Sequence, residues 1–221
     1  MPVTIEFFQA ELEAIYGVEA PEVIQFLVSR DGARAAAGEE PPVPEALLVR
    51  ESEGGLELGL FLDDEVVKAV DAADPHDRRP LLTAPSSLPR LACAAEGVSH
   101  FVYLATRAAA GRPVSLLELE VQAEVDKFAL LVLHLWRRGL RRHSPALRRR
   151  LFQRVSYHAH LAGAELERYQ IANRLGGGYA RWLEGRYVDG ADAEGLVREL
   201  RGSYRLGGGE KLGYLNARAA H

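Results

Sequence analysis

The sequence has little of several features that define common classes of protein. Its only cysteine, Cys93, excludes an intramolecular disulfide and favours a reducing compartment. The longest apolar run, residues 128–135, is interrupted by His134 and is far shorter than the ~20 residues of a membrane-spanning helix. Residues 1–17 contain acids where a secretory signal needs lysine or arginine. We therefore expect a soluble, cytoplasmic protein that does not enter a membrane.

Lysine is also scarce, since 24 of the 27 basic residues are arginine, a composition typical of bacteria with GC-rich genomes. The charges are unevenly distributed along the chain. Residues 1–126 hold 9 basic and 23 acidic residues, whereas residues 127–221 hold 18 and 8. Either the two halves attract each other within one folded unit, or the basic half binds an anionic partner. Because no linker separates the halves, we predict a single domain over residues 1–221.

No segment contains a motif that is specific for one reaction. Gly97–His100 does not fit the nucleophile motif G-x-S-x-G, and neighbouring helical residues such as Ser99 and His100 point about 100° apart. The glycine triplets 176–178 and 207–209 match neither the phosphate-binding loop nor the dinucleotide-binding motif. We expect the first triplet to permit close helix packing and the second to form a flexible loop.

Patterns of metal ligands are missing as well. Carboxylate-bridged di-iron bundles need Glu-x-x-His pairs, and the sequence contains none. His158 and His160 have a spacing that suits a strand, but the flanking residues offer no third ligand. We therefore predict no metal site, and the sequence leaves any cofactor unknown.

The N-terminal part, residues 1–87, contains the clearest β signal. Runs at 46–50 and 56–62, separated by ESEGG, predict a β-hairpin over about 46–62 with alternate leucines on one buried face. A helix is expected at 5–16, and either a short helix or a strand at 21–30. Residues 31–45 and 71–87 are expected to be loops, and Asp63 or Asp64 should cap a short helix through Val70.

From residue 88 onward the pattern is helical. Helices are expected over about 88–110, 115–138, 145–155, 162–184 and 191–201, the second beginning at a capping box of Ser115 and Glu118. The predicted fold class is α+β, mainly α. A hairpin or small antiparallel sheet in residues 1–87 should pack on a bundle of about four helices formed by residues 88–221.

Two polar ladders run along the two longest predicted helices, which are otherwise apolar on most of their surface. Helical spacing aligns Glu96, His100, Tyr103 and Arg107 on the first, and Glu120, Glu124, Lys127 and His134 on the second. Each ladder could be a solvent face with local ion pairs, or a buried network that fixes helix packing. A third possibility is that the ladders form a functional pocket, because perturbed titratable groups gather at functional sites.

Our leading hypothesis is a non-enzymatic binding or accessory protein that uses helix faces to bind a protein or a small anionic ligand. The alternative is an enzyme whose site lies between the two long helices. There His100 would be the general acid or base, with Tyr103 and Glu124 as further catalytic residues. Glu96, Arg107, Glu120, Lys127 and His134 would then contribute to ligand binding.

A dense run of arginine predicts a surface for anions. Its members are Arg137, Arg138, Arg141, Arg142, Arg148, Arg149, Arg150 and Arg154. Because guanidinium groups suit phosphate, nucleic-acid binding through residues 137–154 is a further alternative. It is disfavoured by the net charge of −4 and by the lack of a recognisable nucleic-acid module. The other interpretation is an intramolecular contact with the acidic half.

Overall fold

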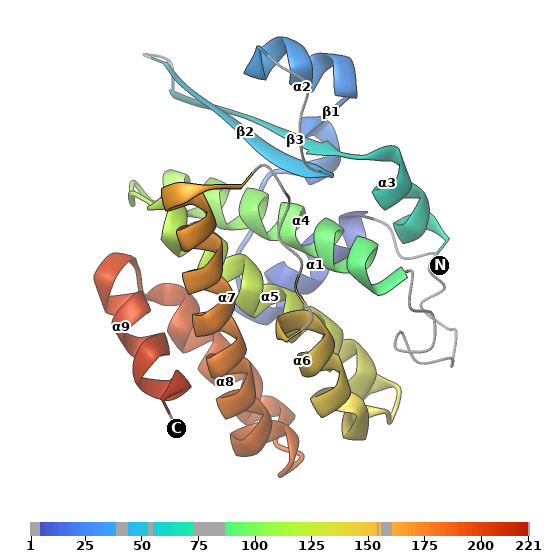
Figure 1. Cartoon of the computed structure of the whole chain (residues 1–221), viewed down its shortest axis with the longest axis vertical. Coiled ribbons are helices and arrows are strands. Elements are labelled where there is room, and N and C mark those ends of the chain that lie inside the picture. The colour runs from blue at the N-terminus through green and yellow to red at the C-terminus, as the bar shows by residue number, and fades with distance from the viewer. Residues whose placement is uncertain are drawn as a thin grey trace. The chain divides into compact units, whose positions relative to one another are not determined.

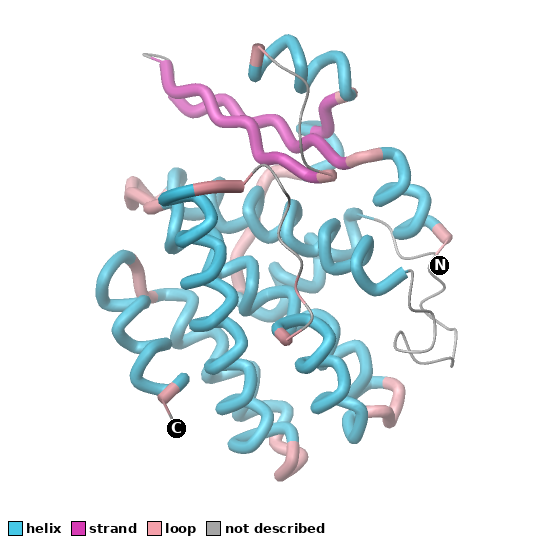
Figure 2. Tube along the Cα trace, viewed as in Figure 1, coloured by secondary structure: helices cyan, strands magenta, loops and turns pink. Residues whose placement is uncertain are grey.

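The computed structural model describes residues 5–38, 44–52, 55–72, 87–153, 155 and 161–220. These residues form an α+β fold that is mainly helical, as the sequence predicts (Figures 1 and 2). The chain divides into two compact units. The sheet unit comprises Met1–Glu11 and Glu19–Pro113, and the helical unit comprises Leu12–Val18 and Val114–His221. No helix in the described ranges is both long and apolar enough to cross a membrane.

The sheet unit contains the predicted hairpin, formed by β2, Glu45–Ser52, and β3, Gly55–Leu62. A third strand, β1, Leu27–Val28, pairs in parallel with β3, so the sheet is mixed with the order β1-β3-β2. The predicted hairpin is confirmed, and the parallel pairing of β1 adds a third strand that the sequence did not predict. Both alternatives for residues 21–30 hold in part, because a 3₁₀ helix, Val23–Phe26, precedes β1.

The end of β3 is buried on both faces. Leu60 and Leu62 are buried as predicted, but Phe61, which points to the opposite face, is buried too. The second face is covered at Phe61 by the Arg30 side chain, whose guanidinium carbon lies 5.3 Å from the centre of the Phe61 ring. A strand with cover on both faces loses the alternation from which a single buried face is inferred.

Helix α2, Arg30–Ala37, stands where the sequence analysis expects a loop. The Ser29 hydroxyl caps the helix by accepting a hydrogen bond from the Gly32 amide at 3.1 Å. Gly38 ends it with a left-handed φ of 79°. Within α2 only Ala33 is buried, so this helix lacks the apolar stripe on which sequence interpretation depends. Residues 39–43 and 73–86 of the two expected loops lie outside the described residues.

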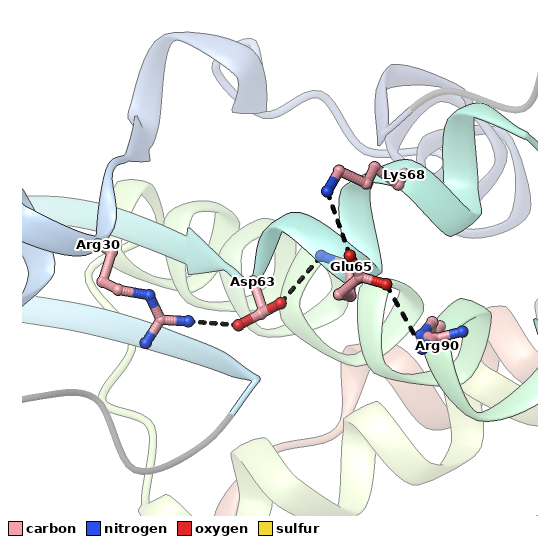
Figure 3. A network of polar contacts seen from close by, with 5 residues as sticks. All are labelled: Arg30, Asp63, Glu65, Lys68 and Arg90. Carbon is pink, nitrogen blue, oxygen red and sulfur yellow. Dashed lines mark hydrogen bonds and ion pairs between the residues drawn. The ribbon is translucent and has the colours of Figure 1, made fainter.

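Helix α3, Asp64–Asp71, begins at the predicted cap, where an Asp63 carboxylate oxygen accepts from the Glu65 amide at 2.9 Å. Figure 3 shows how this cap continues into a chain of ion pairs. Asp63 also pairs with Arg30, and Glu65 pairs with Lys68 at 3.2 Å and with Arg90 at 3.6 Å. Because these groups are largely exposed, each pair contributes little to stability.

Helix α4, Ser87–Ala109, belongs to the sheet unit, whereas we expected it to be the first helix of the bundle. It packs against α3 and against both strands of the hairpin. The approach is close at Gly97, where an added Cβ would lie 3.1 Å from a methyl carbon of Leu60 and of Leu62. Because glycine has no Cβ, α4 can approach the sheet this closely at Gly97.

The helical unit is built around α7, which contacts α5, α6 and α9 (Figure 1). Its helices are α5, Leu116–Arg137; α6, Ser144–Phe152; α7, Gly163–Leu183; α8, Ala193–Arg205; and α9, Gly208–Ala219. A 3₁₀ turn, Arg141–His143, precedes α6, and a π-helical turn, Glu184–Val188, continues α7. The C-terminal part of α1, Ile5–Tyr16, also belongs to this unit. The predicted helices are confirmed, with ends shifted by a few residues.

Residues 207–209 do not form the expected flexible loop, because α9 begins there with Gly207 as its N-cap. The Glu118 carboxylate explains the difference by accepting a hydrogen bond from the Gly208 amide at 2.9 Å. A carboxylate stabilises the positive N-terminal end of a helix. Glu118 lies in the predicted capping box, where the Ser115 hydroxyl accepts from the Glu118 amide at 3.2 Å.

The glycine triplet of α7 faces three different helices. A Cβ on Gly176 would lie 2.5 Å from Cβ of Glu124 on α5, and one on Gly177 would lie 3.0 Å from the Phe152 ring on α6. A Cβ on Gly178 would lie 2.4 Å from Cβ of Ala219 on α9. Real Cβ atoms do not approach so closely, so the prediction of close helix packing is confirmed.

A chain of polar side chains is buried in the core of the helical unit. The Lys211 ammonium, which is 0% exposed, donates to the Gln122 side-chain oxygen. The Gln122 amide donates to Asp126 at 2.7 Å, and the Tyr16 hydroxyl donates to the same Asp126 oxygen. Burial, followed by the charge of Asp126, raises the pKa of Tyr16 well above its usual value. Gln122 thus connects a buried cation to a buried anion.

Candidate anion-binding pocket

The first polar ladder lies on α4 and is not a solvent face. His100, Tyr103 and Arg107 are buried, and Glu96 is half-buried. The His100 Nδ1 lies 3.6 Å from a carboxylate oxygen of Glu45, and Arg107 donates to the Tyr103 hydroxyl at 2.7 Å. The hypothesis that this ladder faces solvent is wrong. The polar residues are buried together with the apolar residues on the rest of α4.

The second ladder lies on α5, where Glu120 and Glu124 are also buried. Glu124 lies 3.1 Å from the Lys127 ammonium, and Glu120 lies 3.6 Å from the Arg168 guanidinium on α7. The Glu120–Arg168 pair joins α5 to α7 and favours a network that fixes helix packing, whereas the Glu124–Lys127 pair lies within α5. Since α4 and α5 belong to different units, a catalytic site formed by both helices stays a prediction.

His134, the last member of the second ladder, is half-buried in the final turn of α5. Burial, reinforced by the charges of Arg138 and Arg137, lowers the pKa of its imidazole to about 4. The folded protein therefore favours neutral His134, whereas the unfolded chain protonates it near pH 6.5. The imidazole thus contributes stability above pH 6.5 that is lost as the pH falls through about 4.

We expect His134→Gln to remove this part of the pH dependence, because glutamine does not titrate. The urea midpoint should fall less between pH 7 and pH 4.5 in the variant than in the unmodified protein. Urea denaturation followed by circular dichroism at the two pH values checks this. An equal fall in both proteins would show that His134 does not titrate differently in the folded state.

Two arginines of the run form contacts within the helical unit. Arg141 donates to the backbone oxygens of Val188 at 2.8 Å and Asp189 at 3.2 Å, and Arg148 donates to Glu184 at 2.9 Å. Both arginines therefore hold the turn that ends α7. Of the others, Arg137, Arg142 and Arg149 are exposed, Arg138 and Arg150 are half-buried, and Arg154 lies outside the described residues, as do His158 and His160.

The helical unit contains a pocket lined by residues from the C-terminal ends of α6 and α9 and from the middle of α7. Its volume is about 420 Å³. Glycines on α7 permit this arrangement, since Gly177 faces Phe152 of α6 and Gly178 faces Ala219 of α9. The lining residues are Arg148, Phe152, Gln153, Asn173, Arg174, Gly177, Gly178, Arg181, Asn216, Ala219 and Ala220.

The pocket is positively charged on its α7 side. Asn173, Gly177 and Arg181 follow one another at four-residue spacing and so share one face of α7, with Arg174 beside them. Among the described residues that line the pocket none is acidic. The charge of Arg148 is offset by buried Glu184, whereas no acidic side chain among the described residues pairs with Arg174 or Arg181.

Two helix ends contribute the opposite polarity. The C-terminal carbonyl groups of a helix carry partial negative charge and need hydrogen-bond donors. Asn173 donates its amide N–H to the Phe152 carbonyl at 3.1 Å, and Arg181 donates one N–H to the Ala219 carbonyl at 3.2 Å. Side chains of α7 therefore satisfy one carbonyl of each helix end. No other described residue accepts a hydrogen bond from Arg181.

Sequence reasoning included Arg148 in the arginine run but missed Asn173, Arg174, Arg181 and Asn216. A local signal exists, because Asn-Arg precedes the glycine triplet, an arginine follows it at helical spacing, and residues 168–183 contain no acid. No known protein family, curated protein or solved structure matches this chain. The site is therefore interpreted from its own geometry.

Proposed function

We propose that this chain is a binding or accessory protein whose helical unit binds a small anionic ligand in the pocket between α6, α7 and α9. The observation that carries the proposal is the convergence of Arg148, Arg174 and Arg181 on a pocket without an acidic lining residue among those described. Guanidinium groups present several N–H donors in a planar fork that matches carboxylate and phosphate oxygens.

The dimensions of the site support a small ligand. Pockets for small molecules have volumes of roughly 300–1,000 Å³ and combine apolar walls with a few polar groups. The present volume of about 420 Å³ falls within this range, and Phe152 and Ala219 provide apolar wall. The arginines lie around a concavity bounded by three helices, whereas a nucleic-acid surface would use the exposed arginines of residues 137–154.

Pyrophosphate binding to the purified full chain tests the proposal. We expect isothermal titration calorimetry at constant ionic strength to detect binding, and Arg174→Gln to weaken it about tenfold, since a hydrogen bond to a charged group contributes roughly 1.5–3 kcal/mol. Arg174 suits this test because it is exposed and forms no ion pair with another described residue. Its replacement should leave the free energy of unfolding unchanged.

Arg149→Gln is the matched control. Arg149 is exposed on α6 and belongs to the arginine run, but it does not line the pocket. This variant loses the same charge and should bind pyrophosphate as tightly as the unmodified protein. Equal weakening by the two variants would point to diffuse attraction instead of a site, and no binding at millimolar pyrophosphate would refute the proposal.

A further inference from the structure

Arg174 and Arg181 stand at the two ends of the pocket wall that α7 provides. Seven residues at ~100° and ~1.5 Å each bring Arg181 back to within ~20° of Arg174 around the helix axis and ~10.5 Å further along it. Both residues are exposed, and both line the pocket. The two arginines therefore share one face of α7 and are almost two helical turns apart.

The wall between the two arginines carries no polar side chain of α7. Within this helix, only Gly177 and Gly178 line the pocket between them. A Cβ on Gly177 would lie 3.0 Å from the Phe152 ring of α6, and Gly178 lies as closely against Ala219 of α9. A molecule that extends from one arginine to the other would therefore lie along glycine backbone and the apolar side chains of Phe152 and Ala219.

The positive charge of the pocket is divided between these two ends. Arg148 is offset by Glu184 at 2.9 Å, whereas Arg174 and Arg181 pair with no acidic side chain in the described part of the chain. A guanidinium group only donates hydrogen bonds, so each end requires acceptor oxygens from a ligand. An anionic group that binds one of the two arginines leaves the other, at the far end, without a partner.

We infer that the ligand is an elongated organic dianion, with a carboxylate or phosphate group at each end of an apolar middle. The inference rests on the proposed anion site and adds the class of its ligand. One anionic group binds Arg174, the other binds Arg181, and the apolar middle lies against Phe152 and Ala219. Two charged contacts at separate points select such a ligand by its length as well as by its charge.

Three small acids test the length and the second charge separately. Pimelate and malonate both carry two carboxylates, which five methylene groups separate in pimelate and one in malonate. Heptanoate has the chain length of pimelate but a single carboxylate. We expect the full chain to bind pimelate about tenfold more tightly than either of the others, which is the effect of one further hydrogen bond between charged groups. Isothermal titration calorimetry at constant ionic strength and neutral pH measures the three affinities.

Variants assign the preference to the two ends of the pocket. In both Arg174→Gln and Arg181→Gln, the ratio of the pimelate affinity to the heptanoate affinity should fall close to one, because only one end keeps its arginine. Arg149→Gln removes an exposed arginine outside the pocket and should keep the preference. Because Arg181 also donates to the Ala219 carbonyl, Arg174→Gln carries the test should Arg181→Gln be unstable.

The outcomes separate this inference from the proposed function. Pimelate that binds no more tightly than malonate or heptanoate would overturn the inference, and so would a preference for pimelate that survives both arginine variants. In either case the binding of pyrophosphate decides independently whether the anion site exists. If neither pyrophosphate nor any of the three acids binds, the proposed function fails and the inference with it.

Discussion

Lys211→Met is expected to lower the free energy of unfolding by about 1.5–3 kcal/mol, because it removes the hydrogen bond from a buried charged group to the Gln122 side-chain oxygen. Lys211 is fully buried, and Gln122 connects it to Asp126, which is 1% exposed. Methionine fills a similar volume but carries no charge. The interior of the helical unit would then lose the ammonium group at one end of this polar chain and keep the Asp126 carboxyl group at the other. Urea denaturation followed by circular dichroism measures the loss.

A double variant separates charge from packing. Asn at position 126 can still accept from Tyr16 and Gln122, so Asp126→Asn removes the charge and keeps the acceptor. We expect Lys211→Met combined with Asp126→Asn to be more stable than the sum of the two single losses predicts, by roughly 0.5–3 kcal/mol. Strict additivity would show that the two charges do not depend on each other.

Alanine within the glycine triplet is expected to destabilise the helical unit in spite of its higher helix propensity. At Gly176 and Gly178 the added methyl group would lie 2.5 and 2.4 Å from Cβ of Glu124 and Ala219. Overpacking of this kind costs typically about 1–3 kcal/mol, because neighbouring helices must move apart. Each variant should therefore show a lower urea midpoint.

Gly202→Ala provides the opposite result as a control. Gly202 lies within α8, is exposed, and has no atom within 4 Å of an added Cβ. Here only the propensity term acts, so we expect stability to rise by up to about 1 kcal/mol. If Gly176→Ala and Gly178→Ala were stabilising as well, α7 would not be packed as closely as the structure shows.

Local sequence signals predicted much of the secondary structure. The hairpin was recognisable because alternating leucines follow a turn sequence, and α5 because Ser115 caps the start of an amphipathic pattern. Each signal is contained within about twenty residues or fewer. The predictions failed for α2 and for the start of α9, where a helix has little apolar stripe of its own or is capped from a distant residue.

The candidate site was much harder to predict from the sequence. Arg148, Asn173 and Asn216 come from three separate helices, and their meeting depends on where α6 and α9 end against α7. The glycine triplet predicted close packing, but it did not indicate which helices would approach α7. The ladder residues were found, but whether they face solvent depends on what packs around α4 and α5.

The sequence by itself determined the α+β class, the positions of most helices, the hairpin, and the two polar ladders. Those features depend on spacing and capping between residues that are close along the chain. The tertiary structure decided that His100 and Glu124 are buried, that Asp126 and Lys211 belong to one buried chain of polar contacts, and that arginines of α6 and α7 line one pocket. Burial and convergence depend on contacts between distant residues, so they are set by the packing of the whole unit.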